Sequence, residues 1–185
     1  MYTIIEDASP YYITFTFPGI EDYIEYVNQQ PLYNNNDNND IFRGKTNDYT
    51  QINYSVEIAQ DIISRLPFSK LFNFKTERVA VLDTPAGNKI RGHKDGLWTK
   101  CSYNIPLKIS DDKCVTTWYT EEELSDCTVD TSTGYSRGAL EFYVRPRTPI
   151  KTTTFRPGEF ILFNTDIWHA WDNSQSTHNR RILTF

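Results

Sequence analysis

The spacing of apolar and polar residues divides the chain into an early part with helical patterns and a later part of short strands. Residues 11–17 are β-branched and aromatic and end at a Pro-Gly pair, which predicts a strand followed by a turn. A helix is expected around residues 20–27, and a second, amphipathic helix over residues 54–66, with Ser55 as its cap and Pro67 after its end. The side chains expected on the buried side of the second helix are Val56, Ala59, Ile62, Ile63 and Leu66.

Beyond residue 79 the chain is a series of short β-branched and aromatic runs separated by Pro, Gly and Asn, without a long helical pattern. Such a series predicts a mainly β fold whose strands form a sandwich or barrel. We expect a double-stranded β-helix, a jelly roll of the cupin-like type, with the N-terminal helices packed on one outer face. The predicted strands are residues 79–82, 101–109, 116–120, 139–144, 152–155, 159–163 and 180–185.

The length of 185 residues predicts one domain over residues 1–185. Residues 79–185 are expected to form its β core, and residues 1–78 a supporting part. Within that supporting part, segment 29–40 is rich in asparagine and nearly free of aliphatic side chains, which predicts a surface loop.

Charge and composition exclude several classes of function. The formal net charge of −5 argues against a nucleic-acid surface, which needs clustered Lys and Arg, and no apolar run is long enough to cross a bilayer. The N-terminus has neither a basic start nor a long apolar segment, so no secretory signal is expected. Three cysteines at unsuitable spacings for zinc predict reduced thiols, and hence a cytoplasmic protein.

Three side chains have the chemistry of a metal site. His93 and Asp95 are two residues apart, so on a strand they face the same side and can bind one ion. His169, from a distant strand, would complete a set of two imidazoles and one carboxylate, which is the arrangement of non-haem Fe(II) oxygenases. The alternative for His93 is a buried or capping histidine.

His169 follows a strand, residues 159–163, and a short polar bend, which would place its imidazole at the start of the next strand. Trp168 and Trp171 on either side would keep water away from a metal ligand. The alternative is that both tryptophans fill the core while His169 binds a backbone carbonyl.

The motif His93-x-Asp95, the segment from Pro157 to His169, and Arg180 eleven residues later resemble the Fe(II)- and 2-oxoglutarate-dependent dioxygenases. The resemblance covers residues 79–185 and is strongest in the last thirty. It is closest to small stand-alone members, some carried by phages, that are loosely related to prolyl and aspartyl/asparaginyl hydroxylases.

The resemblance implies that His93, Asp95 and His169 ligate Fe(II), with 2-oxoglutarate and dioxygen as cosubstrates. An arginine is the expected anchor for the distal carboxylate of 2-oxoglutarate, because its planar fork donates two parallel hydrogen bonds. Both Arg180 and Arg181 are candidates. If the residues that follow at positions 182 and 184 point into the barrel, Arg180 shares their face, and this parity favours Arg180.

Two further polar residues belong to the implied cosubstrate site. Ser102 and Asn104 alternate on the strand after the metal-binding pair, where relatives place polar groups toward 2-oxoglutarate, and Tyr103 would face the other way. For Asn104, a hydrogen bond at the end of the strand is the alternative. Trp98 is a candidate for lining the substrate opening or for covering it.

The implied reaction is hydroxylation of a peptide or protein side chain, or of an amino acid or other small molecule, with release of succinate and CO2. A retained carboxylate at Asp95 favours hydroxylation over halogenation, and a phage-encoded enzyme would act in the host cytoplasm. The alternatives are a cupin-like metalloenzyme that does not use 2-oxoglutarate and a non-catalytic jelly-roll binding module. The acidic balance disfavours nucleic-acid demethylation.

The acidic run over residues 111–137 is either a solvated loop or a selector of cationic substrates. Trp118 and Tyr119 within it would then form an aromatic wall or pack in a sheet.

Overall fold

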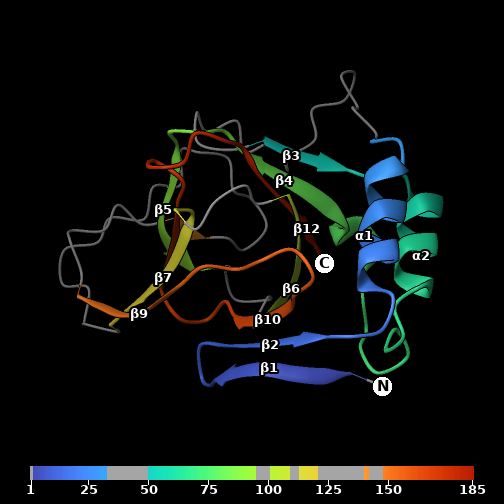
Figure 1. Ribbon diagram of the computed structural model, residues 1–185, viewed down its shortest axis with the longest axis horizontal. Coiled ribbons are helices and arrows are strands. Elements are labelled where there is room, and N and C mark those ends of the chain that lie inside the picture. Colours follow the sequence, from blue (N-terminus) through green and yellow to red (C-terminus); the bar gives the residue numbers. More distant parts are fainter. Residues whose placement is uncertain (1, 33–49, 95–100, 109–112, 121–139, 142–147) are drawn as a thin grey trace.

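Among the residues that the computed structural model describes, two antiparallel β-sheets face each other and two helices cover the outer side of the larger sheet (Figure 1). The structure describes residues 2–32, 50–94, 101–108, 113–120, 140–141 and 148–185. Most of the Asn-rich segment, Trp98 and most of the acidic run lie outside these residues.

The larger sheet has seven strands in the order β1-β2-β10-β6-β12-β4-β3, and the smaller has five in the order β8-β5-β11-β7-β9. Strands distant in sequence are therefore neighbours in both sheets, as in a double-stranded β-helix, which confirms the predicted fold class. The larger sheet consists of β1 (Thr3–Ala8), β2 (Tyr12–Thr16), β10 (Phe160–Asn164), β6 (Cys101–Lys108), β12 (Arg180–Thr184), β4 (Ala80–Thr84) and β3 (Thr50–Asn53). The smaller consists of β8 (Leu140–Glu141), β5 (Lys89–Lys94), β11 (His169–Asp172), β7 (Val115–Tyr119) and β9 (Pro149–Thr153).

Every predicted strand overlaps an observed one, although the prediction over 139–144 is described only at residues 140 and 141. Strands β1 and β3 were not predicted, and β5 and β11 were expected only because His93 and His169 were placed on strands. Each of them is short or largely polar in sequence. Pairing with neighbouring strands, and not local preference, makes these segments extended.

The helices are α1 (Ile20–Gln29) and α2 (Val56–Ser64), and a short 3-10 helix, η1 (Thr76–Arg78), precedes β4. Ser55 caps α2 as predicted, since its Oγ accepts a hydrogen bond from the backbone N–H of Ile58. Ala59 and Ile62 of α2 are buried, but Val56 is exposed, so the predicted buried face is wrong at the first helical position.

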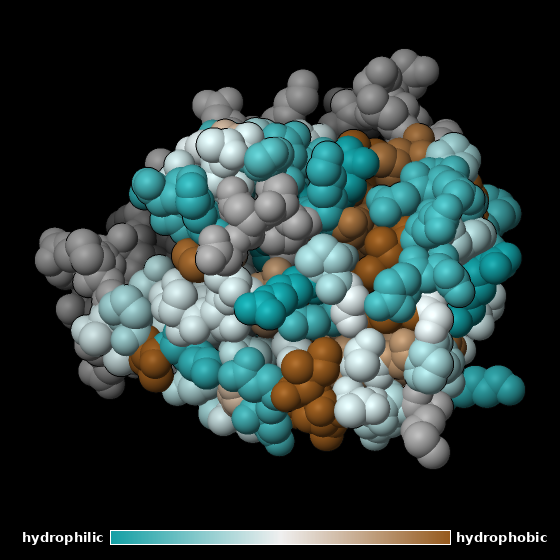
Figure 2. All heavy atoms as spheres, viewed as in Figure 1, coloured by the Kyte–Doolittle hydropathy of each residue, from teal (hydrophilic) through white to brown (hydrophobic). Residues whose placement is uncertain are grey.

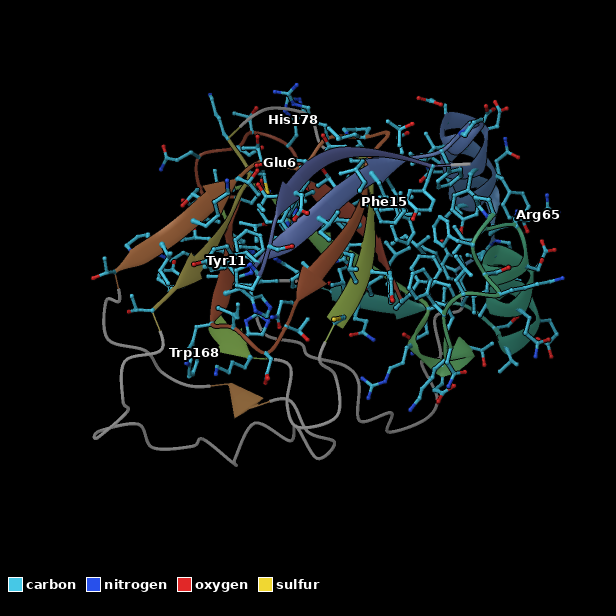
Figure 3. All side chains as sticks on the ribbon, turned by 90° about the horizontal axis from the view of Figure 1, so that it is seen from below. Glu6, Tyr11, Phe15, Arg65, Trp168 and His178 are labelled. Carbon is cyan, nitrogen blue, oxygen red and sulfur yellow. The ribbon has the colours of Figure 1, made fainter. Side chains whose placement is uncertain are left out.

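Two apolar cores lie on opposite faces of the larger sheet, because successive residues of a strand point to opposite sides. In β10, Phe160 packs beneath the helices while Ile161 packs between the sheets. Figure 3 shows the same division, with Phe15 toward the helices and Tyr11 beside the smaller sheet. Among the described residues, the buried apolar side chains between the two sheets are Tyr12, Ile90, Trp118, Phe155, Ile161, Phe163 and Trp171.

The outer edge of the larger sheet is formed by β1, whose Ile4 and Ile5 are exposed. Apolar surface is visible along the bottom of Figure 2, where β1 lies in Figure 1. Within the described part of the chain, neither helix has the length and apolar character needed to cross a membrane.

Candidate functional site

Two histidines that are 76 residues apart in sequence face each other in the smaller sheet. His93 of β5 is the direct antiparallel partner of His169 of β11, and their ring centroids are 4.5 Å apart with 54° between the ring planes. His169 is fully buried and His93 partly so. Strand pairing thus brings together two of the predicted metal ligands.

A β-bulge in β5 orients His93. His169 pairs with His93, but Trp171, two residues on, pairs with Ile90, three residues back. A regular strand would turn Ile90 and His93 to opposite faces, and the extra residue between them allows both to face the space between the sheets. Ile90 belongs to the core there, and the ring of His93 contacts that of Trp171 with centroids 6.3 Å apart.

The hydrogen bond of His169 determines which of its nitrogens can bind a metal. Its Nδ1 lies 2.8 Å from the backbone oxygen of Ile167. A carbonyl can only accept, so Nδ1 carries the hydrogen and the neutral ring has its lone pair on the buried Nε2. Such a bond is typical of metal-binding histidines, so the carbonyl bond that we considered as an alternative is compatible with a ligand role.

His169 is fully buried beside an aromatic ring. Phe163 makes an edge contact with its ring at 5.1 Å, and Trp168 and Trp171 are both buried. Figure 3 shows Trp168 beside the smaller sheet, on the side of the molecule away from Arg65 of the helices. These side chains keep bulk water from the imidazole.

Asp95, the predicted carboxylate ligand, lies outside the described residues, which resume at Cys101. Within the described ranges, no group of three His, Cys, Asp or Glu side chains could hold a metal ion. The described part of the candidate metal site is therefore the histidine pair.

Arg180 and Arg181 lie on opposite faces of β12. Arg181 donates to Asp83, its direct partner on β4, at 2.9 Å. Arg180 is only 3% exposed, and its Nη1 has no hydrogen-bond partner among the described residues. Its guanidinium carbon lies 4.5 Å from the ring centroid of Trp171, and burial lowers its pKa from the ordinary value of an arginine to about 10. The interior therefore holds a buried cation near the histidine pair.

Ser102 and Asn104 face the space between the sheets, as the alternation in β6 predicted. Ser102 pairs with Phe163 and its Oγ is 3.2 Å from Oγ1 of Thr184, while Asn104 pairs with Ile161. Tyr103 points the other way and packs on aromatic rings beneath the helices.

Asn104 does not make the strand-end hydrogen bond that was its alternative. It lies in the middle of β6, is 4% exposed, and its Oδ1 has no partner among the described side chains and backbone groups. A buried amide oxygen of this kind can accept a hydrogen bond from a ligand.

Trp171 was not predicted as a site residue, although its ring lies beside the guanidinium of Arg180 and beside the ring of His93. The available signal was its position two residues after His169, which places both side chains on one face of a strand. Trp118 is fully buried and stacks on Tyr12 with centroids 5.0 Å apart. Of its two predicted roles, Trp118 has the one in sheet packing.

Comparison with known proteins supports the fold class. No family model and no curated protein matches the sequence. Among solved structures, the chain is similar to SnoN, described as a non-heme alpha ketoglutarate dependent epimerase from nogalamycin biosynthesis, with 13% identity over 94% of this chain and 76% of that chain and a TM-score of 0.51. A structure of SnoN in complex with Fe3+, alpha ketoglutarate and nogalamycin RO gives 12% identity, coverage of 94% and 77%, and the same TM-score.

Other matches are more distant. A mutant of Bacillus subtilis oxalate decarboxylase OxdC shares 10% identity over 77% of this chain and 27% of that chain, with a TM-score of 0.40. The chain also matches peruvianin-I from Thevetia peruviana, of which it covers 50%. It therefore spans half of the length of peruvianin-I and less than half of the length of OxdC. At 12–13% identity, the likeness to SnoN shows the fold alone, a double-stranded β-helix.

Proposed function

We propose that the protein is an Fe(II)- and 2-oxoglutarate-dependent oxygenase that hydroxylates a peptide or protein side chain, or an amino acid. One observation carries the proposal: a pair of facing imidazoles and a buried guanidinium share the interior between the two sheets. Histidines suit Fe(II), and a buried cation suits the distal carboxylate of a dicarboxylic acid. Residues 1–185 would act as one domain.

The described residues fit a ferrous ion at the histidine pair. His93 and His169 would be two ligands, His169 through Nε2, and Asp95 would be the third. Together with 2-oxoglutarate and dioxygen, the ion would supply oxidation of a C–H bond to an alcohol, with release of succinate and CO2.

The surroundings of Arg180 fit 2-oxoglutarate. An unpaired charge is expensive to bury, so a guanidinium without a carboxylate partner among the described residues is suited to an anionic ligand. Arg180 would donate to the distal carboxylate, and Ser102 and Asn104 would line the same interior. Arg181 is already paired with Asp83 on the other face of β12, so we do not assign it to the cosubstrate.

The remaining described side chains would exclude water and hold the ligands in place. Phe163 packs on His169, and Ile167 maintains its tautomer through the carbonyl bond. A low-dielectric interior strengthens the attraction between Arg180 and a carboxylate.

The test is a titration with Mn2+, as a stable substitute for Fe(II), of the wild type and of the variants His93→Ala, His169→Ala and Asp95→Ala. Each variant is expected to lose about a hundredfold or more in affinity, because second-shell changes alone cost up to this amount. His178→Ala is the control, since this exposed histidine bonds Thr177 in the loop before β12.

Succinate release measured with Fe(II), oxygen and 2-oxoglutarate completes the test. A screen of amino acids and peptides should find a compound that stimulates it. Undiminished succinate release by Asp95→Ala would contradict the carboxylate ligand, and normal Mn2+ affinity in both histidine variants would refute the metal site. A protein that binds Mn2+ but not 2-oxoglutarate would instead be a cupin-like metalloenzyme.

A further inference from the structure

The partner of the Arg180 guanidinium is an indole ring. Trp171 belongs to β11 of the smaller sheet and Arg180 to β12 of the larger, so the contact crosses the space between the sheets. Both side chains are buried, at 6% and 3% exposure. A cation over an indole face is attracted by the negative charge of the ring face, and more strongly when both are removed from water.

Trp171 is held firmly enough to act as a platform. It pairs with Ile90 on one neighbouring strand and with Thr116 on the other, so its backbone is central in the smaller sheet. Its ring also meets the ring of His93 nearly at a right angle, at 81°. One side chain therefore contacts both the buried cation and one of the two facing histidines.

We propose that Trp171 is a positioning residue that orients Arg180 for the distal carboxylate of 2-oxoglutarate, an inference that rests on the function proposed above. The centre of the guanidinium lies over the indole ring, whose face accepts no in-plane hydrogen bond, so the N–H groups of Arg180 stay available to donate. Nη1 has no acceptor among the described residues, so the stack holds the cation without occupying this donor.

An indole beside Arg180 leaves its N–H groups available to a ligand, whereas a carboxylate would not. A protein carboxylate beside Arg180 would neutralise it and compete with the carboxylate of the ligand for the same N–H groups. An aromatic face attracts the cation but accepts no in-plane hydrogen bond. Arg181, the next residue along β12, is bonded to Asp83 of β4 and is the counterexample.

The experiment is calorimetric titration of 2-oxoglutarate into the Mn2+-loaded protein. Trp171→Leu removes the ring face and is expected to weaken 2-oxoglutarate binding by about thirtyfold, whereas Trp171→Phe keeps a weaker face and should lose only about threefold. Affinity for Mn2+ without 2-oxoglutarate is expected to fall by much less than thirtyfold in both variants, because His93 also keeps its pairing with His169. Trp118→Phe is the matched control, because this buried indole contacts Tyr12, Phe155 and Phe163 instead of Arg180.

The possible results separate this inference from the proposed function. If the wild type and Trp171→Leu bind 2-oxoglutarate equally well, Trp171 has no positioning role and the proposed function survives. If Mn2+ affinity falls in parallel with 2-oxoglutarate affinity, the role is merely structural and the inference is wrong. If Trp171→Leu does not fold, Trp171→Phe is compared with Trp118→Phe. If Trp171→Phe binds 2-oxoglutarate as tightly as Trp118→Phe does, the inference about Trp171 is wrong. A wild type that binds Mn2+ but not 2-oxoglutarate overturns both proposals.

Discussion

Arg180 and Arg181 are chemically identical neighbours whose surroundings differ because a strand alternates its faces. Arg181 is partly exposed and paired with Asp83, and such a pair contributes about 0–1 kcal/mol. Arg180 is buried, has an indole as its neighbour, and its pKa is lowered to about 10 by burial. The fold therefore tolerates a charge at Arg180 at some cost to its stability.

Replacing Arg180 by Met is expected to stabilise the free protein. The lowered pKa of Arg180 corresponds to a cost of about 3 kcal/mol for holding its charged form in the fold. Arg180→Met should recover part of this cost, as an increase of about 1–3 kcal/mol in the free energy of unfolding at pH 7. The cost is fully present below about pH 10 and is relieved as the pH rises from there toward the higher pKa of arginine in the unfolded chain. Urea denaturation measures the increase.

The control for this substitution is Arg181→Met, which loses a partly exposed ion pair and should reduce stability by about 1 kcal/mol or less. It should keep 2-oxoglutarate binding, whereas Arg180→Met should abolish it. A clear loss of stability in Arg180→Met would show that Arg180 already has a strong partner in the free protein.

At the scale of elements, the bulge in β5 orients a histidine of the candidate site, and the helix pair packs behind the larger sheet. The extra residue of β5 turns His93 toward His169 and leaves Ile90 in the core. Behind the larger sheet, α1 and α2 are joined by a hydrogen bond from the Tyr23 hydroxyl to the carbonyl of Ile62, at 3.0 Å. Helices and histidines lie on opposite sides of the larger sheet, so the two features should be separable by mutation.

Tyr23→Phe is expected to lower the free energy of unfolding by about 1–2 kcal/mol, because it leaves a buried carbonyl near the end of α2 without its donor. Affinities for Mn2+ and 2-oxoglutarate should not change. Urea denaturation and the titrations above measure both effects. Tyr26→Phe is the matched control, since its hydroxyl bonds Asp61 on a more accessible surface and its loss should cost less. If both variants lose the same free energy of unfolding, burial is not the reason for the contribution of the Tyr23 hydroxyl.

At the scale of the whole molecule, the ligands proposed here would join the two sheets. The histidine pair belongs to the smaller sheet, while Arg180, Ser102 and Asn104 belong to the larger. A metal with 2-oxoglutarate would therefore connect groups that unfolding separates. Any ligand that binds only the folded state stabilises that state.

Mn2+ and 2-oxoglutarate together are accordingly expected to raise the melting temperature. At a hundred times its dissociation constant, a ligand adds about 2.7 kcal/mol, which corresponds to a rise of about 5–10 °C for a chain of this size. Thermal unfolding followed by circular dichroism measures it. Arg180→Met should respond to Mn2+ but show no further rise with 2-oxoglutarate. An equal rise with 2-oxoglutarate in that variant would refute Arg180 as the anchor.

Local patterns in the sequence were sufficient to predict one capped helix, several strands and the faces on which some side chains lie. The capped helix after Ser55, the strands around Phe160 and Ile182, and the inward faces of Ser102 and Asn104 follow from helical spacing or from alternation. These depend only on residues a few positions apart. His169 was recognisable as a candidate from its local surroundings, and Arg180 from the family resemblance together with strand parity.

Only the tertiary structure decided which strands are neighbours, because periodicity shows which way a side chain faces and not what it meets. The pairing of His93 with His169 depends on register and on a bulge that no local pattern predicted. The stack of Trp171 on Arg180 joins two different sheets, and Asp83 reaches Arg181 from a strand nearly a hundred residues earlier. Such contacts are determined by how the whole chain folds back on itself.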